Sequence, residues 1–187
     1  MKLVGFITFI ILCFSCKHKT ELTDHSAISK HYYMALNEGE TKEEVASLLS
    51  TTLINIQGAD TARYTQETYK DWIAWDRLFE PTYKVISSVN IDDHRVKIKI
   101  EKNDKRIGFL NEEPVVYTEI HTFENQKLSR IELQDYQVFN DSLWIAKRTM
   151  LTSYIKENHP ELDGFIIDQT ADGAKKYLAA LTNYKSK

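Results

Sequence analysis

The stretch "YYMALNEGE", residues 32–40, sets helix-forming and aromatic residues directly before an Asn-x-Gly sequence. From Ser26 onward, residues recur at the three- and four-residue spacing of one helix face: Ile28, His31 or Tyr32, Ala35 and Leu36. Asn37 and Gly39 end this pattern, since Asn and Gly tolerate the left-handed backbone that follows many helices. The stretch therefore predicts a first helix that turns Tyr32 towards a core and leaves His31 and Tyr33 in packing or surface positions.

Further helix signals follow this stretch. Thr41-x-x-Glu44 is a capping box that opens a second helix, and residues 52–58 read as a strand or bend. Residues 59–66 are polar and are expected to form a mobile rim. A third helix is predicted from about Thr65 to just before Pro81.

The second half of the sequence predicts strands and then helices. Alternating or apolar runs indicate strands at 83–91, 94–102, 115–123 and 128–138, and Asn125 is expected to take a positive φ in a hairpin turn. Ser142 is expected to cap a helix that runs through Ile155, and a final helix would bury Tyr177, Leu178 and Leu181. Helices followed by antiparallel strands indicate one α+β domain.

The first sixteen residues read as an export signal. Lys2 precedes an apolar run from Leu3 to Phe14, which is shorter than the roughly 20 residues that a membrane-spanning helix needs. The junction "LCFSC" resembles the lipobox of bacterial lipoproteins, in which Cys16 would receive fatty acyl groups such as palmitate. We expect a signal peptide at 1–15, a lipid-anchored tether at 16–25 and a domain at 26–187, held to a membrane of the bacterial cell envelope.

Composition excludes several classes of protein. The chain has 24 basic and 27 acidic residues, a formal net charge of −3 and no basic run, so nucleic-acid binding is not expected. The two cysteines, Cys13 and Cys16, both fall at the leader, so the domain relies on its core alone. The scattered histidines and the absence of a glycine-rich phosphate loop predict neither a metal site nor a cofactor.

The combination of "YYMALNEGE", "EEVASLLSTTLIN", "TQETYKDWIAWDRLF" and "HTFENQKLSRIELQDYQ" resembles the nuclear transport factor 2-like superfamily, which includes SnoaL-like polyketide cyclases and ketosteroid isomerases. The resemblance spans residues 27 to 140. It implies a curved antiparallel sheet wrapped around N-terminal helices to form a cone with a pocket, followed by a helical extension from about residue 141. Gln126, where the family usually has a hairpin Gly, departs from the pattern.

The same resemblance implies roles for particular residues. Tyr32 falls at the oxyanion-binding Tyr and Glu119 at the carboxylic acid of isomerase-like members, while the position of the catalytic base falls near Gln57, which cannot accept a proton at neutral pH. His121 shares a strand face with Glu119, and Asp135 on the neighbouring strand is expected to approach them. The alternative is that Glu119 and His121 are solvated residues of the outer face.

Two functions remain open at this point, and the sequence leaves undecided whether the protein is an enzyme. The first is a non-catalytic module that binds a small apolar ligand through Tyr32, Trp72 and Tyr117, or a protein partner. The second is a small acid/base enzyme, an isomerase, dehydratase or cyclase, that uses Tyr32, Glu119, His121 and Asp135. Homodimerisation through the convex sheet face, with Val96, Ile98 and Ile100 on one side of their strand, is a further hypothesis.

Overall fold

The computed structural model describes residues 24–37 and 39–186. The predicted signal peptide, Cys16 and most of the tether lie outside these residues. Six α-helices and one short 3-10 helix are present there: α1 (His25–Asn37), α2 (Lys42–Ser47), α3 (Gln66–Arg77), α4 (Lys105–Leu110), α5 (Asp141–Asn158), η1 (Pro160–Leu162) and α6 (Ala171–Lys185). The strands are β1 (Leu49–Gln57), β2 (Asp60–Thr65), β3 (Thr82–Asn90), β4 (Arg95–Asn103), β5 (Val115–Glu124) and β6 (Lys127–Val138).

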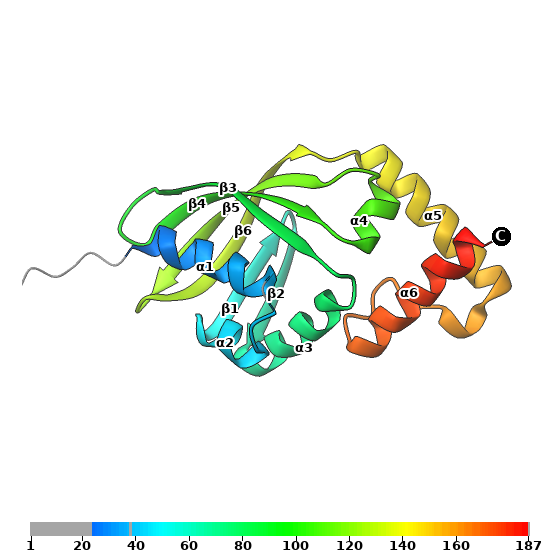
Figure 1. The fold of residues 1–187 in the computed structure, drawn as a ribbon, viewed down its shortest axis with the longest axis horizontal. Helices are drawn as coiled ribbons and strands as arrows, with labels where there is room; N and C mark the ends of the chain where they lie inside the picture. Colours follow the sequence, from blue (N-terminus) through cyan, green and yellow to red (C-terminus); the bar gives the residue numbers. More distant parts are fainter. Residues whose placement is uncertain (1–23, 38, 187) are drawn as a thin grey trace, which may run out of the picture.

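The six strands form one curved sheet in the order β2-β1-β6-β5-β4-β3. Helix α1 lies across its concave side, and α5 and α6 stand at the opposite end from the start of α1 (Figure 1). The predicted α+β cone, with N-terminal helices inside the curve and a C-terminal helical extension, is confirmed. One pair departs from an all-antiparallel sheet, because β1 runs parallel to β6.

The alternation in β4 explains how the sheet covers α1. Val96, Ile98 and Ile100 are completely buried in the main core, together with Tyr32, Tyr33 and Leu36 of α1. The lysines between them face the other side, as the two-residue period of a strand requires. Val96, Ile98 and Ile100 therefore point into the cone and are not available to a dimer contact on the convex face, and homodimerisation itself stays a prediction.

The pairing of β5 with β6 contains a tight hairpin turn and a bulge. Asn125 and Gln126 have φ angles of 49° and 64°, the left-handed pair that a tight two-residue hairpin requires. The expectation for Asn125 is confirmed, and Gln126 takes a conformation in which Gly is the usual residue. The β5–β6 pairing also shifts register between Thr118 and Glu119, and such bulges bend a sheet.

Two segments differ from the expectation. Residues 60–65 are strand β2, paired with β1, and not a mobile rim, because the turn at Gly58, with a φ of 62°, folds them back on β1. Helix α4 was not expected from the sequence. Asp104 caps it by accepting hydrogen bonds from the backbone amides of Arg106 and Ile107 at 2.7 and 2.8 Å.

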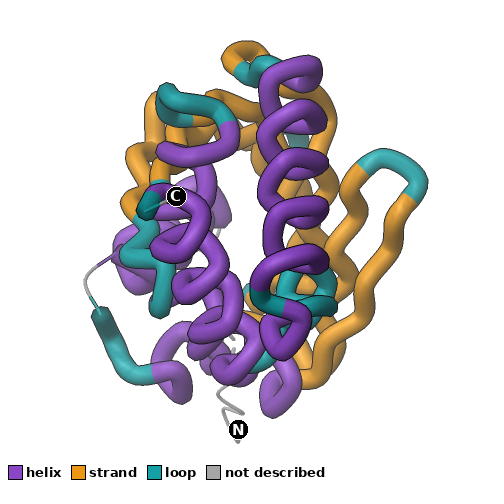
Figure 2. The backbone as a smooth tube through the Cα atoms, turned by 90° about the vertical axis from the view of Figure 1, so that its right-hand side faces the viewer, coloured by secondary structure: helices purple, strands orange, loops and turns teal. Residues whose placement is uncertain are grey.

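The extension has a core of its own. Leu151 and Ile155 of α5 and Tyr177 of α6 pack with Trp75 and Phe79 at the end of α3. Helices α5 and α6 lie side by side in front of the sheet (Figure 2). None of the helices in the described part of the chain is long and apolar enough to cross a membrane.

The start of α5 also corrects one prediction. Asn140 caps α5 by accepting a hydrogen bond from the backbone amide of Leu143 at 3.0 Å, so Ser142 lies inside the helix and is not its cap. The helix ends at Asn158, three residues beyond the predicted Ile155.

Candidate functional site

A cavity of about 410 Å³ occupies the open end of the cone. The concave face of the sheet forms one wall, α1 and α3 form the next, and the extension closes the remaining side. Aromatic side chains dominate this lining: Tyr32, Tyr33, Tyr69, Trp72, Trp75, Tyr83, Tyr117, Tyr136, Phe139, Trp144 and Tyr177. Its size and aromatic character match those of small-molecule sites in general.

Glu119 of β5 marks the deep end of the cavity. The carboxyl group is almost buried, and its Oε2 atom accepts a hydrogen bond from the Tyr33 hydroxyl and lies 3.3 Å from Nε2 of His121. Nδ1 of His121 in turn lies 3.1 Å from Oγ of Ser29. A neutral imidazole satisfies both contacts, with Nε2 donating to Glu119 and Nδ1 accepting from the serine hydroxyl.

Glu119 and His121 share a strand face as predicted, and the alternative that they are solvated residues of the outer face is wrong. Their positions differ, however. Glu119 lines the cavity, whereas His121 is completely buried behind it and is not part of the lining. His121 therefore positions the carboxylate and cannot touch a bound molecule directly.

Tyr33, and not Tyr32, is the tyrosine of the opening stretch that contacts Glu119. The Tyr32 hydroxyl is hydrogen-bonded to that of Tyr69 on α3, and Tyr33, expected only to pack, is the residue that donates to Glu119. Burial, with the charge of Glu119 behind it, raises the pKa of both Tyr32 and Tyr33 above the usual tyrosine range. Both hydroxyls therefore stay protonated at neutral pH. His31 is exposed on the outer side of α1.

Asp135 does not join this group. It pairs with Thr118 across the β5–β6 ladder and is exposed, whereas Glu119 pairs with Leu133. The bulge between Thr118 and Glu119 changes which residues lie opposite one another, and Asp135 does not line the cavity. The expectation that it approaches Glu119 and His121 is therefore wrong.

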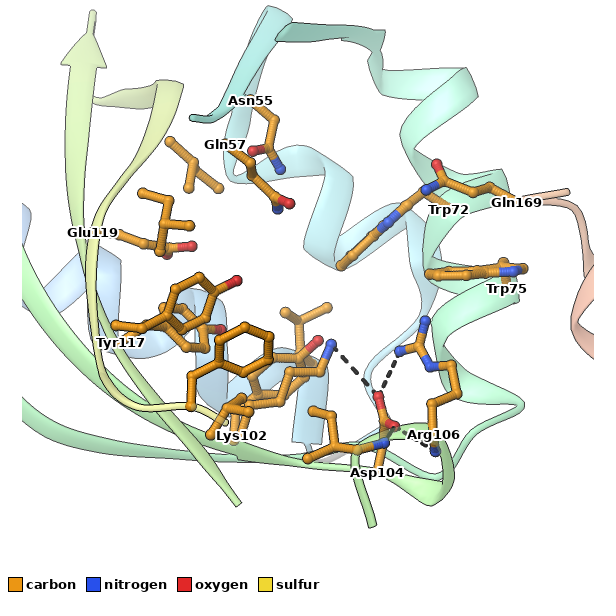
Figure 3. A pocket seen from close by; sticks show the side chains of 18 of the residues that line it. Asn55, Gln57, Trp72, Trp75, Lys102, Asp104, Arg106, Tyr117, Glu119 and Gln169 are labelled. Atoms are coloured by element: carbon orange, nitrogen blue, oxygen red, sulfur yellow. Dashed lines mark hydrogen bonds and ion pairs between the residues drawn. The ribbon is translucent and has the colours of Figure 1, made fainter. Parts of the chain in front are cut away.

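Gln57, near the predicted base position, does line the cavity from β1, and Asn55 lies two residues before it on the same face. Figure 3 shows both amides directed into the space between Glu119 and Trp72. Across from Glu119 the cavity thus presents amides where an isomerase-like site would carry a carboxylate base.

A second polar cluster lies at the rim, where α3, β4 and α4 meet. Asp76, which is 1% exposed, accepts hydrogen bonds from Lys102 at 3.0 Å, Arg106 at 2.9 Å and the Tyr83 hydroxyl at 2.6 Å. Arg106 also pairs with Asp104. Burial opposes ionisation of Asp76, but Lys102, Arg106 and Tyr83 together outweigh it and hold the pKa of this carboxyl below its usual range.

Arg106 also connects the rim to the extension. Its guanidinium lies 4.3 Å from the ring centre of Trp75 and 4.0 Å from that of Phe79, both members of the second core. Two acidic and two basic groups cancel in this cluster, which points to a structural role. From the extension itself, Trp144, Arg148 and Gln169 reach the cavity.

The predicted ligand-binding residues Tyr32, Trp72 and Tyr117 all line this cavity. Figure 3 shows Trp72 facing Tyr117 and Glu119 across the open space. Within residues 24–37 and 39–186 there is no group of three His, Cys, Asp or Glu side chains that could hold a metal ion.

Solved structures identify the architecture. An uncharacterised cystatin-fold protein from Novosphingobium aromaticivorans has a TM-score of 0.50 and 16% identity, and the match covers 59% of this chain and 97% of that one. The chain has the NTF2-like cone fold. The epoxide hydrolase/cyclase-like enzyme SalBIII, described as acting in pyran ring formation in the polyether salinomycin, matches with a TM-score of 0.50 and 13% identity over 63% of this chain and 92% of its own.

A third neighbour is an NTF2-like protein of unknown function from Cytophaga hutchinsonii, with 13% identity, a TM-score of 0.48 and coverage of 64% of this chain and 94% of that one. No family model matches the sequence, and no curated protein matches it either. At such low identity the likeness shows the NTF2-like fold alone, and neighbours with this fold include both enzymes and proteins of unknown function.

Sequence reasoning missed Tyr33, Tyr69 and the rim cluster around Asp76. One signal was available for Tyr33, because it lies three residues before Leu36 and so shares the helix face of that buried residue. Asp76 and Arg106 lie 30 residues apart, and the sequence around each of them does not predict that they form a buried ion pair.

Proposed function

We propose that the protein is a lipid-anchored, non-catalytic binding protein of the bacterial cell envelope, and that its cavity holds a small ring-bearing molecule. The observation that carries the proposal is a cavity of about 410 Å³ with aromatic walls and only amides opposite Glu119. A second proton-transfer group across the cavity from Glu119 would have to be an ionisable side chain. Asn55 and Gln57 cannot supply one, but they can orient a ligand.

The anchor part of the proposal rests on the sequence. The leader and the "LCFSC" junction favour acylation of Cys16, and multiple acyl chains hold a domain on a membrane stably. Replacing Cys16 by Ser should release the protein from the membrane fraction, and metabolic labelling with a palmitate analogue should mark the wild type only. A membrane-bound and unlabelled wild type would refute the anchor.

The binding part is tested on protein purified from its own envelope. Native mass spectrometry should show an added small-molecule mass on the wild type. The variant Asn55→Phe, which fills the space in front of β1, should lack that mass, whereas Asn90→Phe, at the exposed end of β3, should retain it. A bare protein in every sample would overturn the proposal.

A second candidate function is acid/base catalysis at Glu119. The observation that favours it is the Tyr33–Glu119–His121 hydrogen-bond chain, which brings an ionisable group to the cavity wall. Exchange of the α protons of a cyclic ketone for deuterium in heavy water would detect such an activity. Faster exchange with the wild type than with Glu119→Gln would favour the enzyme, and equal exchange would favour the binding protein.

A further inference from the structure

The deep half of the cavity holds side-chain polar groups that have no partner in the protein. Both hydrogen bonds to Glu119 fall on Oε2, from Tyr33 and His121, and in the described part of the chain none falls on Oε1. The Tyr117 hydroxyl, two residues earlier on the same strand face, likewise has no hydrogen-bond partner among those residues. Figure 3 shows both groups directed into the open space.

Oε1 of Glu119 and the Tyr117 hydroxyl offer one hydrogen-bond acceptor and one donor. Oε1 of Glu119 can only accept when the carboxyl is ionised, and the Tyr117 hydroxyl remains a donor, because burial followed by the nearby Glu119 charge raises its pKa. A neighbouring donor and acceptor on one wall fit a hydroxyl group, which both gives and receives a hydrogen bond.

The opposite wall of the cavity also presents hydrogen-bond donors and acceptors, from the side chains of Asn55 and Gln57. Gln57 pairs with Leu133 of β6, and Leu133 pairs with Glu119 of β5, so Gln57 and Glu119 stand in one row across the sheet. Two strand spacings separate their backbones by about 10 Å. Within the described residues the amide groups of Asn55 and Gln57 have no side-chain hydrogen bond, and each offers both donors and an acceptor.

Resting on the proposed binding function, we propose that the ligand is a neutral ring with several hydroxyl groups, of the size of a monosaccharide. One edge bonds to Glu119 and Tyr117, and the other bonds to Asn55 and Gln57. The apolar CH face of such a ring packs on an aromatic side chain, and Trp72 projects into the space between the two polar walls (Figure 3).

Other ligand classes fit less well. A hydrocarbon would cover the buried Glu119 carboxylate and Tyr117 hydroxyl without giving either a hydrogen-bond partner, which weakens binding. An anion between these two walls would meet the Glu119 carboxylate, while Lys102 and Arg106 are already neutralised by Asp76 and Asp104. The third cation of the lining, Arg148, comes from the extension and not from either of these walls. An ammonium group offers donors only, and would leave the Tyr117 hydroxyl and the amide N–H groups without an acceptor.

Calorimetric titration of the full chain tests the inference. The probes are the neutral pyranoses glucose, galactose, mannose and N-acetylglucosamine. N-phenyl-1-naphthylamine, an aromatic amine without hydroxyl groups, is the apolar comparison. We expect saturable binding of at least one pyranose, weakened about tenfold by Tyr117→Phe and by Asn55→Ala. The control Tyr64→Phe removes a hydroxyl outside the cavity lining and should leave the affinity unchanged.

The outcomes separate this inference from the proposed function. If N-phenyl-1-naphthylamine binds wild type and Tyr117→Phe equally and no pyranose binds, the cavity is a ligand site but the hydroxylated ring is wrong. If a pyranose binds with the same affinity to Tyr117→Phe, Asn55→Ala and wild type, the assigned contacts are wrong. If no probe binds, both the inference and the proposed function fail. Circular dichroism melting curves confirm that each variant is folded before it is titrated.

Discussion

The molecule has two buried polar clusters that differ in whether their charges are balanced within the protein. At the rim, two carboxylates and two cations form ion pairs with one another: Asp76 and Asp104 with Lys102 and Arg106. At the deep end, Glu119 is held through one oxygen and presents the other to the cavity. Balanced charges point to a structural cluster, even though Nε of Arg106 is buried without a hydrogen-bond partner, whereas a carboxylate oxygen that faces the cavity without a protein donor is suited to a ligand.

This comparison predicts that the rim and the deep end respond differently to mutation. Changes at the rim should lower the free energy of unfolding strongly, because they leave charges buried without partners. Changes at the deep end should lower the free energy of unfolding less, and should lower the affinity for the ligand more.

The largest effect is expected at Asp76. Replacing it by Ala leaves Lys102 and Arg106 with fewer partners in a buried site, and we expect the free energy of unfolding to fall by about 3–5 kcal/mol. Urea denaturation measures the change. Asp71→Ala, an exposed position on the same helix, is the matched control and should stay within about 0.5 kcal/mol of wild type. A loss below about 1 kcal/mol at Asp76 would remove the structural interpretation of the rim.

The next effect tests whether the extension supports the rim. Leu151 is completely buried in the second core, so Leu151→Ala should cost about 2–5 kcal/mol in the same denaturation experiment. We expect one cooperative transition, since Arg106 stacks on rings of that core. Two separate transitions would show that the extension and the cone unfold independently, and that the rim does not couple them.

A smaller loss is expected at the deep end. Tyr33→Phe removes the hydroxyl that donates to Glu119 and should cost about 1–3 kcal/mol, because Oε2 then keeps only His121. The measurement is again urea denaturation, with Tyr64→Phe as the control for loss of a tyrosine hydroxyl. Equal losses in the two variants would mean that the hydrogen bond to Glu119 has no special contribution.

The smallest expected effect is a loss of stability at low pH. Because the pKa of Asp76 is lowered in the folded state, its contribution to stability is fully present above the ordinary Asp pKa of about 3.9 and is lost as the pH falls through the lower folded value. Wild type should therefore lose more stability than Asp76→Asn between about pH 4 and pH 2. Parallel melting-temperature curves for the two proteins would contradict this assignment.

Most of the fold could be predicted from local signals. Residues close together in the sequence mark where two helices begin or end: the capping box at Thr41 and Glu44, and the stop at Asn37. The alternation of apolar and basic residues in β4 shows that one face of this strand is buried and the other is exposed. The short helix α4 was missed because its six residues carry little periodicity, although Asp104 is an ordinary cap.

The candidate site could be predicted only in part. The resemblance to the nuclear transport factor 2-like superfamily implied that Tyr32 and Glu119 belong to the site, and Trp72 and Tyr117 were the further candidates; all four line the cavity. The error at Asp135 came from one bulge, because a single register shift changes which residue lies opposite Glu119. The rim cluster depends on tertiary contacts between α3, β4 and α4, which no local pattern contains.

The central claim, that the cavity is a binding site, has a direct optical test. The chain contains three tryptophans, and Trp72, Trp75 and Trp144 all line the cavity. Titrating the protein with the small-molecule fraction of its own envelope should produce a saturable change in tryptophan emission. We expect Asn55→Phe to abolish this change and Asn90→Phe to preserve it. An emission spectrum that never changes with wild type, or changes equally with Asn55→Phe, would contradict the account.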